Sequence, residues 1–212
     1  MFAYTGLEGI IARLIGLVLA FTFHEWAHAK SADVMGDPTP RSMGRLTLNP
    51  LAHVDPIGLL LLFLAGFGWA KPVPVNPYNF ADPRRGMVLV AAAGPLSNVV
   101  LAYLTLVLLR VPGFAAVAGG TLVGPALEAF YQFNLVLAVF NLLPIPPLDG
   151  SKILAGLLPG RSGSLYALEQ YGPMILILLV FTRVIGRILG PLIRGLHGLL
   201  EALVGALGGM AW

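Results

Sequence analysis

Four long apolar runs constrain this chain more than any other feature of its sequence. They cover approximately residues 7–29, 86–110, 124–143 and 171–190. An α-helix needs about 20 apolar residues to cross the hydrocarbon core of a bilayer, so each run is long enough for one crossing. Charged residues make up only 11% of the chain, whereas soluble domains contain about 25%. The sequence therefore predicts an all-α polytopic membrane protein, a bundle of about four to six transmembrane helices.

The rest of the composition indicates one membrane-embedded domain over residues 1–212, because no stretch of mixed composition is long enough to form a soluble domain. We expect a core of about residues 7–160, followed by C-terminal helices at about 171–210. For the glycine-rich tail 188–210, an interfacial amphipathic helix and a final crossing are both open. The chain has no cysteine, which excludes disulfides and cysteine-ligated metals. Its net charge of +3 gives no reason to expect a nucleic-acid partner.

Basic residues predict the orientation of the helices, because Lys and Arg concentrate in cytoplasmic loops. The segment 111–124, after the second run, is nearly free of charge and fits the outer face. The loops between the first two runs contain Lys30, Arg41, Arg45, Lys71, Arg84 and Arg85. The C-terminal end of the first helix is therefore expected at the cytoplasmic side.

A shorter apolar run at 56–70 has cytoplasmic features on both flanks, which favours a re-entrant element over a full crossing. Asp55 can cap it, with Pro56 at the first helical position. In GRLTLNP, Gly44 to Pro50, leucines alternate with polar residues as in a β-strand. In KPVPVNP, Lys71 to Pro77, three prolines favour extended backbone. We expect this small β-strand and re-entrant element at the cytoplasmic side of the bundle.

The motif HEWAH places His24, Glu25 and His28 at the end of the first apolar run. Residues four apart lie on one face of a helix, so both imidazoles can bind one metal ion, as in the zinc motif HExxH. Glu25 is rotated away from that face and can reach a metal-bound water without binding the metal. The alternative is a polar cluster that faces the lipid headgroups. Ionisable residues inside membrane spans are costly without partners, which favours the metal site.

A catalytic zinc ion usually has three protein ligands and one open position. Asp149 is the best third ligand, because NLLPIPPLDG breaks the helix at about the membrane depth of His24. The alternative is that Asp149 only caps a helix that begins at Ser151. His53 is expected to order a loop, and His197 to lie at the membrane interface. One zinc ion with two neutral histidines, one aspartate and a hydroxide carries no net charge, which suits a low-dielectric site.

HEWAH together with NLLPIPPLDG resembles the site-2 proteases, which are intramembrane zinc metalloproteases. Three further segments carry the resemblance, which runs from about residue 15 to residue 160: GRLTLNPLAHVDPIG, GWAKPVPVNP and AAAGPLSN. The resemblance implies that His24, His28 and Asp149 bind one Zn²⁺ ion per chain. It also implies that Glu25 is the general base and that Asn141 holds the substrate carbonyl or its oxyanion.

The resemblance further implies a compact form without PDZ or CBS domains, in a prokaryotic plasma membrane with the site towards the cytoplasm. The substrate would be a single-pass membrane protein, such as an anti-sigma factor, or a remnant signal peptide. An exposed strand edge at Leu46, Thr47 and Leu48 would pair with the unwound substrate. The alternative function is a membrane metal-binding or transport protein without proteolytic activity. Whether the chain forms a homo-oligomer is open.

Overall fold

The computed structural model describes residues 6–58, 68–111, 113–114, 118, 121–158 and 162–208, the side chains of 162–169 and 207–208 excepted. Over these residues the chain is mainly helical, and an isolated bridge between Val54 and Ala70 is the one described β-contact. The α-helices are α1 Leu7–Val34, α2 Thr39–Ser42, α4 Pro83–Arg110, α6 Val123–Asn141, α7 Asp149–Leu157, α8 Ser162–Phe181 and α9 Val184–Gly208. Two 3₁₀ helices, η1 Pro50–Ala52 and η2 Pro77–Asn79, lie in the connection between α2 and α4.

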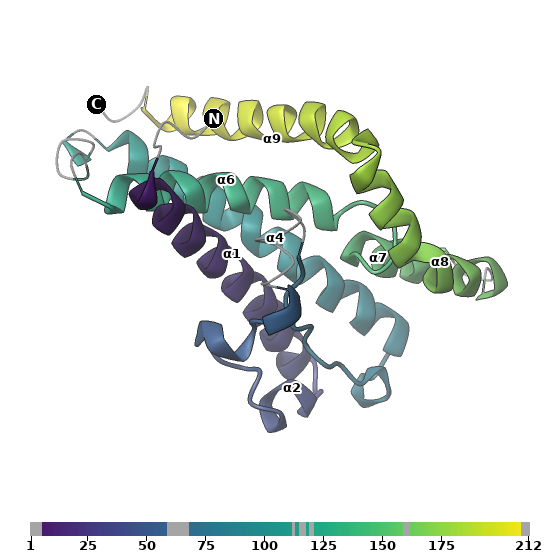
Figure 1. Cartoon of the computed structure of the whole chain (residues 1–212). Coiled ribbons are helices and arrows are strands. Elements are labelled where there is room, and N and C mark those ends of the chain that lie inside the picture. Colours follow the sequence, from purple (N-terminus) through teal and green to yellow (C-terminus); the bar gives the residue numbers. More distant parts are fainter. Residues whose placement is uncertain are drawn as a thin grey trace.

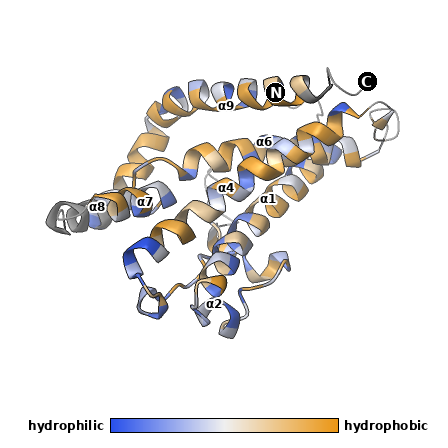
Figure 2. Cartoon of the chain, turned by 180° about the vertical axis from the view of Figure 1, so that it is seen from behind, coloured by the Kyte–Doolittle hydropathy of each residue, from blue (hydrophilic) through white to orange (hydrophobic). Residues whose placement is uncertain are grey.

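Helices α1, α4 and α6 pack against one another and form the centre of the molecule (Figure 1). Within the described residues, four helices are long and apolar enough to cross a membrane, namely α1, α4, α6 and the Val184–Ala206 part of α9. Apolar residues dominate these helices, whereas hydrophilic residues gather around α2 and the start of α4 (Figure 2). The chain is therefore an integral membrane protein of the all-α polytopic class, as predicted.

Small residues allow α1 to approach α6 closely. Ala12, Gly16 and Ala20 are buried and recur every four residues, so they form one stripe along α1. A Cβ atom on Gly16 would lie 2.5 Å from the backbone nitrogen of Phe130. Close contact between small residues is the usual basis of helix packing in membranes, where burial of apolar surface gives little driving force. His24 and His28 continue the same four-residue stripe towards the C-terminal end of α1.

The predicted span at 171–190 is wrong, because the chain turns in the middle of this apolar run. Helix α8 ends at Phe181, and α9 begins at Val184. Between them Arg183 adopts a φ of 59°, the left-handed region that ends a helix. Hydropathy does not depend on such a backbone reversal, so the sequence predicts one helix here.

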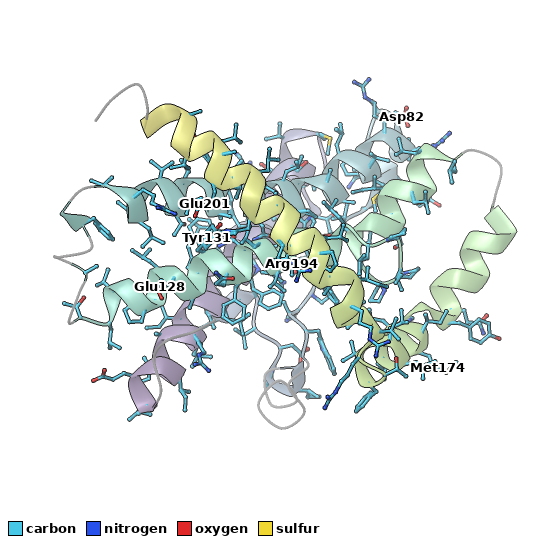
Figure 3. The ribbon with its side chains drawn as sticks, turned by 90° about the horizontal axis from the view of Figure 1, so that it is seen from above. Asp82, Glu128, Tyr131, Met174, Arg194 and Glu201 are labelled. Carbon is cyan, nitrogen blue, oxygen red and sulfur yellow. The ribbon has the colours of Figure 1, made fainter. Side chains whose placement is uncertain are left out.

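Helix α9 covers the region for which two alternatives were open, and its packing favours a crossing over an interfacial helix. It lies along α6 and contacts α4 (Figure 1). Leu200 is buried in a cluster with Leu106 and Leu135. His197 hydrogen-bonds with the hydroxyl of Tyr131 at 2.7 Å, and its expected place at the membrane interface stays a prediction. Figure 3 shows Tyr131 beside α9 in a view from above.

The predicted β-strand at Leu46, Thr47 and Leu48 is wrong, because this segment bends in the described structure. Turn contacts replace strand pairing: the Asn49 N–H donates to Thr47 Oγ1 at 3.1 Å, and His53 Nε2 donates to the Thr47 carbonyl at 2.8 Å. Ser, Thr and Asn side chains commonly redirect the backbone in this way. The loop-ordering role expected for His53 agrees with this contact.

The predicted re-entrant element lies mostly at residues 59–67, outside the described part of the chain. Its start is as predicted, because Asp55 Oδ1 accepts the N–H groups of Ile57 and Gly58, both at 2.9 Å. The segment 71–76 has no helix, as its prolines predict. Lys71 in this segment donates its N–H to the carbonyl of His53 at 2.8 Å.

Candidate metal centre

Three side chains predicted as metal ligands converge in the interior of the bundle. His24 and His28 project from one face of α1, and Asp149 is the first residue of α7. Asp149 Oδ2 lies 3.3 Å from His24 Nε2 and 3.1 Å from His28 Nε2, and the two nitrogens are 3.0 Å apart. None of the three residues is more than 8% exposed. Segments far apart in the sequence thus meet in one buried cluster.

The triangle formed by these three atoms fits a zinc ion. Tetrahedral zinc binds nitrogen and oxygen at about 2.0–2.2 Å, which separates its ligand atoms by roughly 3.3–3.5 Å. The observed separations of 3.0–3.3 Å need to widen by only a few tenths of an ångström. Two imidazoles and one carboxylate are also a donor set that catalytic zinc sites use.

The position of Asp149 excludes one of its two predicted roles. The N-cap of α7 is Leu148, and no side chain in the described part of the protein caps this helix end. The carboxylate of Asp149 points instead to the two histidines, so the capping alternative is wrong. Gly150 lets the turn approach the end of α6, because a Cβ atom there would clash with the carbonyl oxygens of Leu142 and Leu143. The Asp-Gly sequence therefore serves the approach of α7 to α6.

The environment of Asp149 favours its ionised form. Its second oxygen, Oδ1, lies 3.7 Å from Lys152 Nζ. A carboxylate must be ionised to bind a metal, so the charge state suits the predicted role.

Helix α4 fixes the orientation of both imidazoles. His24 Nδ1 donates to Asn98 Oδ1 at 2.6 Å, and His28 Nδ1 donates to the Val90 carbonyl at 2.7 Å. Both acceptors lack a proton, so the hydrogen of each ring is on Nδ1 and Nε2 is left to bind a metal. Val90, Gly94 and Asn98 follow one another at four-residue spacing, opposite the histidine stripe of α1. A Cβ atom on Gly94 would lie 2.5 Å from His28 Cε1 and 2.7 Å from His24 Cε1.

Glu25 and Asn141 line the same cavity of about 440 Å³ as the three predicted ligands. Glu25 is not one of the clustered ligands, and its Oε2 accepts the Val73 N–H at 3.2 Å. Asn141 Nδ2 donates to the Leu137 carbonyl at 3.1 Å. The structure thus brings together five residues predicted for the site. The described lining of this cavity does not include Leu46, Thr47 or Leu48, so their pairing with a substrate stays a prediction.

Several residues of the site were not identified from the sequence. The cavity wall contains the extended segment around Val73. Val73 lies between Pro72 and Pro74, which have no N–H, so it offers the one backbone donor of these three residues. Gly94 and Asn98 contributed only to the family resemblance. Their four-residue spacing equals that of His24 and His28, and this match is the one signal that could have identified them.

Comparisons with known proteins agree with this geometry. Residues 113–182 match the model of Peptidase family M50. The chain is 42% identical over 198 residues to "Putative zinc metalloprotease YwhC" of Bacillus subtilis, covering 91% of this chain and 90% of the relative. It is 34% identical over 195 residues to "Putative zinc metalloprotease Rip2" of Mycolicibacterium smegmatis, covering 87% and 71%. It is 33% identical over 145 residues to "Putative zinc metalloprotease MJ0611" of Methanocaldococcus jannaschii, covering 68% and 69%.

No solved structure matches the chain significantly. The family model includes the break that carries Asn141 and Asp149, and the relatives align over more than two thirds of this chain. The chain therefore belongs to Peptidase family M50, the family of the site-2 proteases.

Proposed function

We propose that this chain is a zinc metalloendopeptidase that hydrolyses a peptide bond within or near a transmembrane helix of a membrane-protein substrate. The observation that carries the proposal is the buried triangle of His24, His28 and Asp149 with Glu25 beside it on one cavity. The names of the relatives, which describe zinc metalloproteases, support the same chemistry. His24, His28 and Asp149 would hold one zinc ion.

The residues of the cavity have distinct tasks in peptide hydrolysis. Bound zinc would supply a Lewis acid that polarises the substrate carbonyl and acidifies water. Glu25 takes the proton of the attacking water and passes it to the leaving amine. The Val73 N–H holds one oxygen of Glu25, which leaves the other oxygen for this proton transfer. Asn141 Nδ2 uses one hydrogen for the Leu137 carbonyl, and its second hydrogen is available for the substrate oxyanion.

The proposal includes an orientation in the membrane. Basic residues flank the end of α1 that carries the histidines, and hydrophilic residues gather around nearby α2 (Figure 2). We therefore propose that residues 1–212 form one domain in a prokaryotic plasma membrane, with the site towards the cytoplasm. This position also lets water reach the zinc ion. Single-pass regulators such as anti-sigma factors, or remnant signal peptides, would be the substrates.

The experiment combines zinc analysis with cleavage of a single-pass model substrate, for wild type and Glu25→Gln. The expected result is one zinc ion per chain in both proteins and cleavage slower in the variant by roughly a hundred- to ten-thousandfold, because Glu25 transfers protons but binds no metal. A chain without zinc would overturn the metal site. Zinc binding with no cleavage by either protein would favour the metal-binding or transport alternative. Equal cleavage by both proteins would exclude Glu25 as the base.

A further inference from the structure

A series of buried hydrogen bonds connects His24 on α1 to α6 by way of Asn98 on α4. His24 Nδ1 donates to Asn98 Oδ1 at 2.6 Å, and Asn98 Nδ2 donates to Asn134 Oδ1 at 2.7 Å. Asn134 Nδ2 then donates to the carbonyl of Phe130 at 2.7 Å. Asn98 and Asn134 have no exposed surface, and His24 is 3% exposed. These hydrogen bonds therefore run from α1 through α4 to α6.

The direction of every hydrogen bond in this series follows from its last acceptor, the carbonyl of Phe130. The Phe130 carbonyl can only accept, so Asn134 must present its NH₂ group there and its Oδ1 to Asn98. Asn134 Oδ1 also can only accept, so Asn98 must present its NH₂ group. Asn98 Oδ1 is then left for His24. The Ala20 carbonyl, 3.4 Å from Asn98 Nδ2, favours the same orientation.

The two histidines differ in how this direction is imposed. The acceptor of His28 is a backbone carbonyl of α4, which keeps its polarity without help from another side chain. The acceptor of His24 is a side-chain amide, which could rotate and present its NH₂ group instead. Such a rotation would favour the ring form with its hydrogen on Nε2, where the metal must bind. The orientation of Asn98 therefore needs a fixed partner, and Asn134 is in that position.

We propose that Asn134 is a positioning residue of the metal site, acting through Asn98 to keep the Nε2 atom of His24 free of hydrogen. This inference rests on the proposed function, because it assumes that His24 binds a metal ion. It adds that α6, which contributes none of the three predicted ligands, controls the metal affinity of a ligand on α1. Asn134 lies two helical turns before Asn141, so α6 supports both ends of the site.

The test measures zinc affinity of the purified full chain by competition with a zinc chelator. Asn98→Leu should weaken zinc binding roughly ten- to hundredfold, as loss of a hydrogen bond to a metal-binding histidine usually does. Asn134→Leu should weaken it less, by about tenfold, because Asn98 keeps the Ala20 carbonyl. The double variant should bind zinc no more weakly than Asn98→Leu alone. Singles whose effects multiply in the double variant would overturn the proposal.

Two further variants separate positioning from packing. Asn134→Asp, with its buried carboxyl protonated, can still donate to Phe130 and accept from Asn98, so it should bind zinc within about threefold of wild type. Thr105→Val removes another hydrogen bond of α4, from the hydroxyl of buried Thr105 to the Leu101 carbonyl, and should leave zinc binding unchanged. If Thr105→Val weakens zinc binding as much as Asn134→Leu does, the loss in Asn134→Leu comes from disturbed helix packing and the positioning role of Asn134 is wrong.

A spectroscopic reading on wild type keeps the proposal testable even if the leucine variants fail to fold. With ¹⁵N-labelled histidine in the metal-free chain, the neutral form of the His24 ring should carry its hydrogen on Nδ1. A hydrogen on Nε2 would overturn the proposal. If wild type binds no zinc while its ring form is as expected, the proposed function fails separately.

Discussion

Gly94 lies where α4 passes the two histidines, and its missing side chain leaves the space that both imidazoles occupy. The requirement for glycine at position 94 is steric, because a Cβ atom there would lie 2.5 Å from His28 Cε1 and 2.7 Å from His24 Cε1. Both rings are also held in place, because the Nδ1 atom of His24 donates to Asn98 and that of His28 donates to the Val90 carbonyl. The rings therefore cannot retreat without breaking the hydrogen bonds that orient them.

We expect Gly94→Ala to weaken zinc binding by at least tenfold, because one or both rings must leave their hydrogen-bonded positions. The measurement is zinc affinity by competition with a chelator, together with thermal unfolding. Gly195→Ala is the matched control, since a Cβ atom on Gly195 of α9 meets no atom of the described residues within 4 Å. It should bind zinc normally and be as stable as wild type or slightly more so. Normal zinc affinity in Gly94→Ala would contradict the role of this close contact.

At the scale of elements, the sequence predicts what depends on local pattern. The runs at 7–29, 86–110 and 124–143 correspond to α1, α4 and α6, because about 20 apolar residues in a row determine a membrane helix. The histidine pair was identifiable because the four-residue spacing lies within one helix. The break at Arg183 was not, since a left-handed residue leaves no trace in hydropathy. The predicted strand at 46–48 is wrong because turn hydrogen bonds, such as that from the Asn49 N–H to Thr47 Oγ1, determine the backbone there, and two alternating leucines are too short a pattern to exclude them.

The parts of the site that could not be predicted depend on how two helices are placed beside each other. Asn98 and Gly94 matter only because α4 aligns them with His24 and His28. No periodicity within α4 reveals that alignment. Likewise, only the folded chain shows that the N–H of Val73 reaches Glu25.

Helix α9 is held against the bundle by polar contacts as well as by Leu200. The two carboxylate oxygens of Glu201 each lie 2.7 Å from Arg110 Nη2, at the end of α4. Figure 3 shows Glu201 on α9 near Tyr131 of α6, the partner of His197. Because the Arg110 side chain is 58% exposed, solvent or headgroups screen the ion pair and its contribution is modest.

We expect Glu201→Arg to lower the unfolding temperature by a few degrees, because it places two positive charges at this contact and removes an ion pair worth about 0–1 kcal/mol. The charge-exchanged double variant Arg110→Glu/Glu201→Arg should recover most of the loss. Arg187→Glu, at an exposed position on the same helix, is the control. Thermal unfolding in detergent measures all four proteins. A double variant no more stable than Glu201→Arg would show that the ion pair does not hold α9.

At the scale of the whole molecule, the site depends on a fixed position of the irregular connection between α1 and α4 relative to the helical bundle, because Glu25 on α1 is held by Val73 of that connection. Asp37, fully buried just after α1, joins the two. Its Oδ1 accepts the hydroxyl of Thr39 and the side-chain amide of Asn79, both at 2.6 Å. Its Oδ2 accepts the Asn76 N–H at 2.8 Å, three residues after the Val73 N–H that holds Glu25. Asp37 thus fixes the segment that orients the proposed base.

This arrangement predicts how stability depends on pH. Burial raises the pKa of Asp37, but the hydrogen bonds from Thr39, Asn79 and Asn76 lower it more, so the folded-state pKa lies below the usual value. A lowered folded-state pKa stabilises the fold above the pKa of the unfolded chain, about 3.9, and this stabilisation is lost as pH falls through the folded-state value. Asp37→Asn should therefore be less stable than wild type at pH 7. The difference should shrink below about pH 4.

Unfolding temperature measured from pH 7 down to about pH 2.5 gives the comparison. The amide that replaces the carboxylate in Asp37→Asn does not titrate, so the curve of this variant should fall less steeply than that of wild type over the acidic range. Glu128→Gln removes an exposed carboxylate of α6 (Figure 3) and should leave the wild-type curve unchanged. Parallel curves for wild type and Asp37→Asn would mean that the carboxylate charge does not hold the connection. Cleavage at pH 7 should also fall in Asp37→Asn, since the Val73 segment is then less firmly placed against Glu25.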